Sequence, residues 1–254
     1  MKILAIVSTV GGAGRTTLTA ELASLLVARG NPVLAIECDP RNVLGMYFGM
    51  EAPPKAGLSS PILATASEAW ADAGFVSDDG VLFVPWGSGG VDGEALARMD
   101  RDPNWLRKRL ALVALPAHGV ALVDTATWPS VQASQAIAAA DLVLVLTPPA
   151  PAVCATLEGF RQAMVASGTP CAYVANLVNP ARQLHADIMA LLRTTLGPAM
   201  LPYPVHQDEG VPEAFTRNEA FHLTSPHSQA AHDLHGLASW VSGWINGGAQ
   251  GAPA

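Results

Sequence analysis

Residues 8–17 read S-T-V-G-G-A-G-R-T-T and stand between an apolar run, Ile3 to Val7, and a long helical pattern. The glycines at positions 11, 12 and 14 let the backbone turn tightly enough for its N–H groups to face a polyphosphate. A helix beginning at Thr16 would present its partially positive N-terminus to the same anion. We expect Thr16 to ligate Mg²⁺ and Thr17 to hydrogen-bond a phosphate. For the glycines taken alone, the alternative is an ordinary tight turn between a strand and a helix.

The order of strand, glycines, cation, Thr-Thr and helix is much harder to produce by chance than a glycine-rich turn. Arg15 stands where phosphate-binding loops of this type carry a lysine. The sequence therefore predicts a phosphate-binding loop formed by Gly11, Gly12, Ala13, Gly14, Arg15, Thr16 and Thr17.

The composition indicates a sizeable buried core. Half of the 254 residues are hydrophobic and only 14% are charged. A chain of this length suits one large α/β domain or two small ones, and the pattern along it favours one domain over residues 1–246. The tail at 247–254, GGAQGAPA, has nothing to bury and is predicted to be disordered.

Several features favour a cytoplasmic protein. No stretch of eighteen apolar residues is free of a charge or a proline, and the first strand begins almost at the N-terminus. We therefore expect neither a membrane span nor a signal peptide. Cys38, Cys154 and Cys171 are far apart and lack CxxC spacing, which fits a reducing compartment.

The formal net charge of −7 argues against a nucleic-acid partner, because such binding depends on neutralising phosphates. One segment is locally basic. It holds five of the fourteen Lys and Arg residues: Arg98, Arg101, Arg107, Lys108 and Arg109. A solvated helix face is the simpler interpretation, and a docking patch for an acidic partner or an anionic lipid surface is the alternative.

Apolar runs with strand character alternate with helical patterns along nearly the whole chain. Strands are predicted at 2–8, 32–38, 81–84, 119–123, 141–147, 170–176 and 199–203. Helices are predicted at 15–29, 59–73, 104–115, 129–139, 150–167, 180–196 and 226–246. We expect Gly30 to end the first helix and Ser59 to cap the second. Continuously apolar strands suit a sheet covered on both faces, so the sequence predicts a doubly wound, mostly parallel α/β sheet flanked by helices.

Two of the predicted strands end in carboxylates, at the edge where a parallel sheet binds its ligand. Asp39 follows the second strand and could orient a water for in-line attack on a γ-phosphate. Alternatively, it caps the turn ahead of Arg41-Asn42. Asp124 closes the apolar run GVALV and is placed to hold Mg²⁺ through water. Each acid is a weak signal alone. Together with the glycine loop that follows the first strand, they make three correctly ordered strand ends that support one another.

The runs GGAGRTT, VLAIECDP and ALVDTA resemble the deviant Walker-A ATPases, the family that includes the MinD and ParA proteins. The resemblance covers nearly the whole chain and implies a P-loop ATPase that binds ATP or ADP with Mg²⁺. It places Asn176, which closes the strand in AYVANLV, on the adenine edge. It also makes residues 201–215, including Pro204, the loop that wraps the base. Within the family, PVHQDE at 204–209, ASW at 238–240 and VPWG at 84–87 are most similar to a branch of cellulose-synthesis accessory proteins.

Three positions depart from the family's pattern. The slot of its defining lysine, which reaches a dimer partner's nucleotide, is Val10; the first glycine of the loop is Thr9; and the general P-loop lysine is Arg15. An arginine keeps the charge and can grip phosphate oxygens, but its planar fork cannot mimic a compact ammonium. We expect nucleotide binding to survive and hydrolysis to be weak or absent, with Asp39 and Arg15 as the catalytic residues.

The resemblance implies a nucleotide-sandwich homodimer that serves a cellulose or exopolysaccharide synthase. Its partners would be synthase subunits, which could recruit it to the inner membrane face or a cell pole. The alternative is a cycling ATPase for positioning or partitioning. Against it, residues 218–254 contain no Lys or Arg, so neither a basic membrane anchor nor a DNA-binding surface is expected there. A scaffold without nucleotide is the third interpretation, but it would have no physical need for the glycines, Thr16, Asp39 and Asp124 together.

Overall fold

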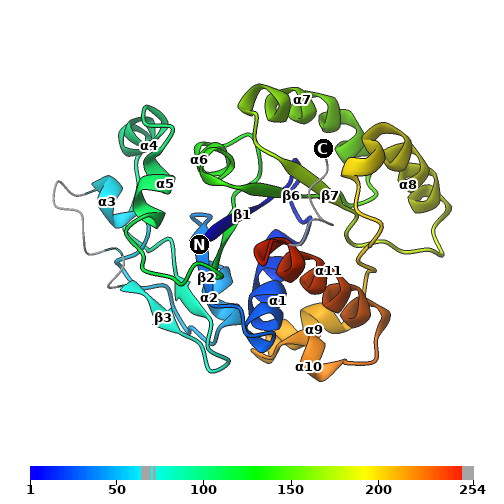
Figure 1. The fold of residues 1–254 in the computed structure, drawn as a ribbon, viewed down its shortest axis with the longest axis horizontal. Helices are drawn as coiled ribbons and strands as arrows, with labels where there is room; N and C mark the ends of the chain where they lie inside the picture. Colours follow the sequence, from blue (N-terminus) through cyan, green and yellow to red (C-terminus); the bar gives the residue numbers. More distant parts are fainter. Residues whose placement is uncertain (64–69, 71–72, 248–254) are drawn as a thin grey trace.

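The structure is a computed structural model, and it describes residues 1–63, 70 and 73–247. At its centre lies a sheet of seven strands in the order β3-β4-β2-β5-β1-β6-β7 (Figure 1). All neighbouring strands are parallel except β3 and β4. The strands are β1 Lys2–Val7, β2 Val33–Cys38, β3 Phe75–Val76, β4 Leu82–Val84, β5 Val120–Thr125, β6 Leu142–Leu146 and β7 Cys171–Val174. The predicted doubly wound, mostly parallel α/β fold is confirmed.

Helices cover both faces of the sheet (Figure 1). One face carries α1 Arg15–Ala28, α2 Leu44–Tyr47, α9 Gly210–Thr216, α10 Phe221–Thr224 and α11 Gln229–Ile245. The other face carries α3 Ser60–Leu63, α4 Gly93–Asp100, α5 Trp105–Leu110, α6 Val131–Ala139, α7 Pro151–Ser167 and α8 Gln183–Leu196. The short 3₁₀ helix η2, Gly197–Ala199, follows α8.

This layering explains why the strands are apolar throughout. In β1, Ile3, Ala5 and Val7 pack into the core under α3–α8, while Leu4 and Ile6 pack into the core under α1 and α11. Successive side chains of a strand point to opposite faces, so each residue of a strand between two helix layers meets an apolar neighbour. α1 ends where expected, because Gly30 adopts φ +81° and returns its N–H to the carbonyl of Val27 at 2.8 Å.

The predicted strand at 199–203 is wrong. This segment makes an isolated parallel bridge between Met200 and Tyr173, and Leu201 N–H donates to the Tyr173 carbonyl at 2.7 Å. Pro202 and Pro204 lack the N–H that a continuous ladder needs, so only single contacts form along β7. The antiparallel strand β3 and the helices α2, α4, α9 and α10 were not predicted, because each is only two to eight residues long.

The predicted helix at 59–73 is confirmed only as α3 at its start. Residues 64–69 and 71–72 lie outside the described part of the chain. Ser59 does not cap this helix through its side chain, because its buried hydroxyl has no hydrogen-bond partner among the residues that the structure describes. The prediction of a disordered tail concerns residues 248–254 outside the described part, apart from Gly247.

The basic segment at 98–109 lies on α4, α5 and the turn between them, and several of its charges are neutralised locally. Arg98 pairs with Glu94, Arg107 with Asp141 and Lys108 with Asp102, at 3.1, 2.8 and 2.8 Å. Exposed pairs of this kind favour the interpretation as a solvated helix face. Among the described residues, no helix is both long and apolar enough to cross a membrane.

Candidate functional site

The carboxyl ends of β1, β5 and β2 lie side by side, and they bring the predicted site residues together. Asp124 on β5 is in register with Ile6 on β1 and with Glu37 on β2. Because the strands are parallel, the loops that follow them meet at one edge of the sheet. The glycine loop and the Asp39 turn therefore flank Asp124 from either side.

The glycine loop leads from β1 directly into α1. Gly12 and Gly14 have φ angles of +69° and +85°, in the left-handed region that glycine tolerates best. Gly14 is the N-cap of α1, and no side chain accepts a hydrogen bond there. The first N–H groups of α1 are thus left for an anion, as at other helix N-termini that bind phosphate.

Asn176, just beyond β7, is packed against this loop. Its Nδ2 donates to the carbonyl of Ala13 at 2.7 Å, and a Cβ on Gly14 would lie only 2.5 Å from the same nitrogen. Position 14 therefore requires glycine twice, once for its backbone angle and once for its lack of a side chain. The contact also joins the loop to the pocket described below.

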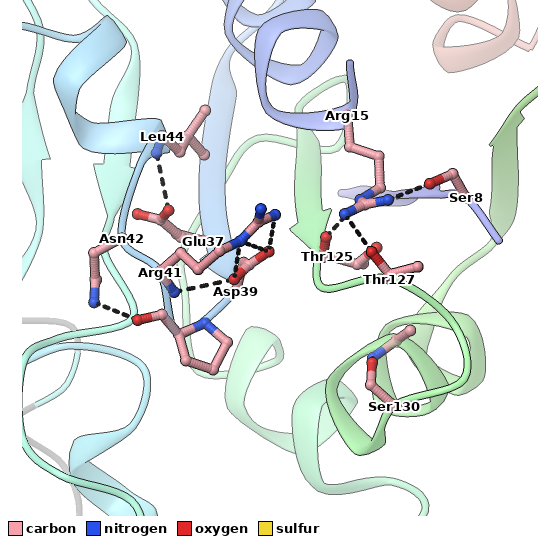
Figure 2. Close-up of polar contacts among 12 residues, drawn as sticks. Ser8, Arg15, Glu37, Asp39, Arg41, Asn42, Leu44, Thr125, Thr127 and Ser130 are labelled. Atoms are coloured by element: carbon pink, nitrogen blue, oxygen red, sulfur yellow. Dashed lines mark hydrogen bonds and ion pairs between the residues drawn. The ribbon is translucent and has the colours of Figure 1, made fainter. Parts of the chain in front are cut away.

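Arg15, at the start of α1, points toward Ser8, Thr125 and Thr127 (Figure 2). It is 4% exposed, and its guanidinium donates to the Thr125 carbonyl at 2.8 Å, the Val10 carbonyl at 3.0 Å, the Thr127 hydroxyl at 2.9 Å and the Ser8 hydroxyl. Four of its five N–H groups thus serve protein oxygens. Burial lowers the pKa of Arg15, although Asp124 and Asp39 oppose the change. A phosphate contact for Arg15 stays a prediction. To make it, the guanidinium would have to share or give up some of its hydrogen bonds to these protein oxygens.

Asp124 is buried completely, and within the described part of the chain neither of its carboxylate oxygens has a partner at full hydrogen-bond geometry. Burial raises its pKa to about 7, while the Thr16 hydroxyl and the charge of Arg15 oppose the rise. A buried carboxylate without partners is costly unless a ligand compensates it. Carboxylate and hydroxyl oxygens are ligands that Mg²⁺ accepts, directly or through water. The residues present therefore fit a magnesium ion held near Thr16 and Asp124.

Asp39 is also buried, at 3% exposure, but its carboxylate is occupied. Arg41 donates to it from its backbone N–H at 3.0 Å, from Nε at 3.1 Å to each oxygen, and from a terminal nitrogen at 2.6 Å (Figure 2). The backbone contact is the turn cap considered as the alternative for this residue. A water-orienting role for Asp39 is a prediction that this pairing does not test.

Glu37 was missed by the sequence reasoning, although a charged residue inside the apolar run VLAIEC was a usable signal. Its side chain is 1% exposed and accepts from the Leu44 N–H at 2.9 Å, which anchors the start of α2. Burial raises its pKa to about 8, and the neighbouring Asp124 and Asp39 contribute to the rise. The ends of β2 and β5 therefore hold three buried carboxyl groups.

Thr17, predicted to bind phosphate, shares a 2.7 Å hydrogen bond with the hydroxyl of Tyr47 on α2. The Tyr47 ring stacks on Phe215 of α9, with ring centroids 4.3 Å apart. This chain of contacts ties the loop helix to α2 and α9.

A cavity of about 200 Å³ opens beside the glycine loop. Its wall combines Gly14, Thr17 and Asn176 with most of the segment 205–212 and with α11. Its lining also includes Leu18, Leu177, Ala230 and Leu234, so much of it is apolar. Such a cavity next to a phosphate-binding loop suits a flat, weakly polar ring.

The lining includes Val205, His206, Gln207 and Asp208, but Pro204 is not among the described residues that line it. Asp233 of α11 orients His206 by accepting from its backbone N–H at 3.0 Å and pairing with Nδ1 at 2.7 Å. Pro204 was predicted from its place in the loop, and a direct contact between it and a ligand stays a prediction.

Val10 lies half-buried in the slot where the deviant Walker-A family carries its lysine, and it packs against both hydrophobic cores. The family model described as "Cellulose biosynthesis protein BcsQ" matches residues 1–241. The chain belongs to the BcsQ family. The cellulose biosynthesis proteins BcsQ of Salmonella typhimurium and Salmonella typhi are each 27% identical to it over 251 residues, which is 94% of this chain and 94% of each relative.

Solved structures share the fold of this BcsQ-family chain. The septum site-determining protein MinD of Pyrococcus horikoshii, complexed with Mg-ADP, has a TM-score of 0.76 at 21% identity, covering 98% of this chain and 99% of that one. Cyanothece McdA in complex with ATP has a TM-score of 0.79 at 20% identity, covering 97% and 96%. Cobyrinic acid a,c-diamide synthase of Mycobacterium smegmatis, with an ATP analogue and magnesium, has a TM-score of 0.77 at 16% identity over both full chains. The predicted relation to MinD-type proteins is confirmed at the level of the fold.

Proposed function

We propose that this BcsQ-family chain is an ATP-binding accessory protein of bacterial cellulose or exopolysaccharide synthesis. Membership of the family and the names of the Salmonella relatives support the cellulose role. Residues 1–246 form the ATPase domain. The protein acts in the cytoplasm, and synthase subunits recruit it to the inner membrane face or a cell pole.

The nucleotide, ATP or ADP, lies along the glycine loop. The N–H groups from Gly11 to Thr17 hold its phosphates, and the base enters the cavity beside Asn176. Thr16 and Asp124 hold Mg²⁺, which supplies charge neutralisation at the phosphates when it is bound.

One observation carries the nucleotide site. Among the described residues, the buried Asp124 has no partner at full hydrogen-bond geometry, and it lies beside a glycine loop whose helix N-terminus has no side-chain cap. Without a ligand, the buried carboxylate and the uncapped helix N-terminus would each lower the stability of the fold and give nothing in return. A scaffold that binds no nucleotide is therefore the weaker interpretation.

Hydrolysis is weak. Arg15 is held by four protein oxygens, and Val10 supplies no charge. Precise positive charge around the transferring phosphoryl group stabilises its transition state, and the two positions where the family carries lysines, Val10 and Arg15, do not supply it here. A long-lived ATP complex suits a nucleotide-sandwich homodimer that keeps its partners assembled.

The test is light scattering of the purified protein with ATP–Mg²⁺, with ADP–Mg²⁺ and without nucleotide, while phosphate release is followed. We expect ATP to produce dimers with negligible release. Asp124→Asn is expected to lose the Mg²⁺ dependence of nucleotide binding, whereas Asp187→Asn, on the exposed face of α8, is the matched control. Rapid turnover with a reversible dimer would support a cycling, positioning ATPase instead. No response to any nucleotide would refute the proposal.

A further inference from the structure

The site holds two arginines with opposite surroundings. Arg15 is buried and donates to four protein oxygens. The side chain of Arg41 is 61% exposed, and every hydrogen bond found for its guanidinium among the described residues goes to Asp39. Arg41 can therefore change partner by breaking one ion pair, and Arg15 cannot.

The backbone around Arg41 is fixed on both sides. Asp39 directly follows β2 and holds the Arg41 N–H. Asn42, at φ +53°, exchanges two hydrogen bonds with Gly87, at 3.0 Å through its Oδ1 and 3.2 Å through its Nδ2. Only the side chain of Arg41 is left free to swing, so a change of partner needs no rearrangement of the loop.

The charge of Arg41 interacts with the buried groups of the site. It acts on both Asp124 and Arg15, and the pKa of Arg41 is raised by its hydrogen bond to Asp39 and by the charges of Asp39, Asp124 and Glu37. In Figure 2, the Arg41–Asp39 pair lies between the contact of Glu37 with Leu44 and the group around Arg15. If the phosphates lie on the glycine loop with Mg²⁺ at Thr16 and Asp124, as proposed above, the last phosphate of a triphosphate ends near this pair, because the Asp39 turn follows β2, the neighbour of β5.

We propose that Arg41 senses the γ-phosphate: a bound triphosphate takes its guanidinium from Asp39 and so frees the Asp39 carboxylate to hold a water. The proposal rests on the nucleotide binding proposed above. A guanidinium fork fits phosphate and carboxylate oxygens equally well in shape, but the terminal phosphate carries more negative charge. ADP offers no anion at this position, so with ADP Arg41 stays on Asp39. Asp39 is then available only when ATP is bound.

Binding affinities measured by calorimetry test this, with Mg²⁺ and either ADP or the non-hydrolysable triphosphate AMP-PNP. Arg41→Gln is expected to weaken AMP-PNP binding about tenfold, which is 1.4 kcal/mol, and ADP binding less than about twofold. Arg41→Lys is expected to restore part of the loss, because it keeps the charge without the fork. The control is Arg161→Gln on α7, which removes an arginine from a surface pair with Glu158 and should change neither affinity.

Asp39→Asn supplies the reciprocal test. It releases Arg41, so AMP-PNP should bind roughly threefold more tightly, and the gain should vanish when Arg41→Gln is added. Equal losses for both nucleotides in Arg41→Gln, or no loss, would overturn the role of Arg41 while leaving nucleotide binding intact. Failure of the unaltered protein to bind either nucleotide would instead refute the proposed function, and this role with it.

Discussion

The glycine loop and the Asp39 turn flank the same carboxylate, and each contributes an arginine, yet the two regions are built differently. The loop buries Arg15 and surrounds it with oxygens from the loop after β1, from the end of β5 and from the segment after β5. The turn leaves Arg41 mostly in solvent with one partner. The presence of an arginine in a binding site therefore does not show whether that arginine binds the ligand. The number of protein partners indicates whether a charge supports the fold or is available to a ligand.

The largest expected effect comes from removing each arginine in turn. Arg15→Met would leave four buried or half-buried oxygens without their donor, and we expect the free energy of unfolding to fall by roughly 3 kcal/mol, or about 10 °C in Tm. Arg41→Met should cost less than about 1 kcal/mol, because its guanidinium is largely solvated. Urea unfolding of both variants measures the difference. Equal losses would mean that the two arginines are alike in their support of the fold.

Asp124, the carboxylate between the two regions, should make the stability of the fold depend on pH. The pKa of Asp124 is raised to about 7 and that of Glu37 to about 8, so the folded state keeps these protons to higher pH than the unfolded chain does. For each carboxyl group, the folded state binds more protons than the unfolded chain at any pH between the ordinary pKa, near 4, and the raised pKa. The free energy of unfolding therefore falls as the pH rises from about 4 to 8.

Asp124→Asn removes about half of this cost without changing the shape of the side chain. Without nucleotide we expect it to be more stable than the unaltered protein by roughly 3 kcal/mol at pH 8 and equal to it at pH 4. Urea unfolding at the two pH values is the measurement. A variant that is less stable at pH 8 would show that the ionised Asp124 already has a compensating partner.

A third prediction concerns how rigidly the loop is specified. Gly14→Ala places a Cβ 2.5 Å from Asn176 Nδ2 at a φ of +85°, and it should cost about 2 kcal/mol and weaken nucleotide binding. Gly11→Ala is the matched control in the same loop, because its Cβ would meet nothing within 4 Å. Thermal unfolding of both variants separates the two positions. Similar losses at both would show that the loop needs flexibility rather than this geometry.

The smallest expected effect comes from the hydrogen bond that joins α1, after the glycine loop, to α2, after the Asp39 turn. Tyr47→Phe removes the 2.7 Å hydrogen bond to Thr17 and keeps the stack on Phe215, so it should cost about 1 kcal/mol or less. The measurement is again urea unfolding, with the nucleotide affinity alongside. A larger loss of affinity than of stability would show that Tyr47 positions Thr17 for the ligand.

Much of the site followed from local patterns. The glycines, Thr16, Asp39 and Asp124 lie at one edge of the sheet because apolar runs predict parallel strands and parallel strands collect their carboxyl ends. Glu37 was missed, since a strand continuing into EC gives no hint of which way its acid points. Pro204 was placed at the base cavity, but its neighbour Val205 is the residue that lines it. Consecutive residues from Val205 to Glu209 line the cavity, so the sequence predicted the right loop but not the residue at which its contact with the cavity begins.

By itself, the sequence determined the α/β class, the loop and its helix, and the edge of the sheet where the chemistry collects, because periodicity and glycine act through residues close along the chain. Only the tertiary structure decided the direction of Arg15 and the pairing of Arg41. The oxygens that turn Arg15 inward include those of Thr125 and Thr127, more than a hundred positions further along the chain. Whether a charged side chain is buried or free depends on which strands lie beside it, and that is set by the packing of the whole sheet.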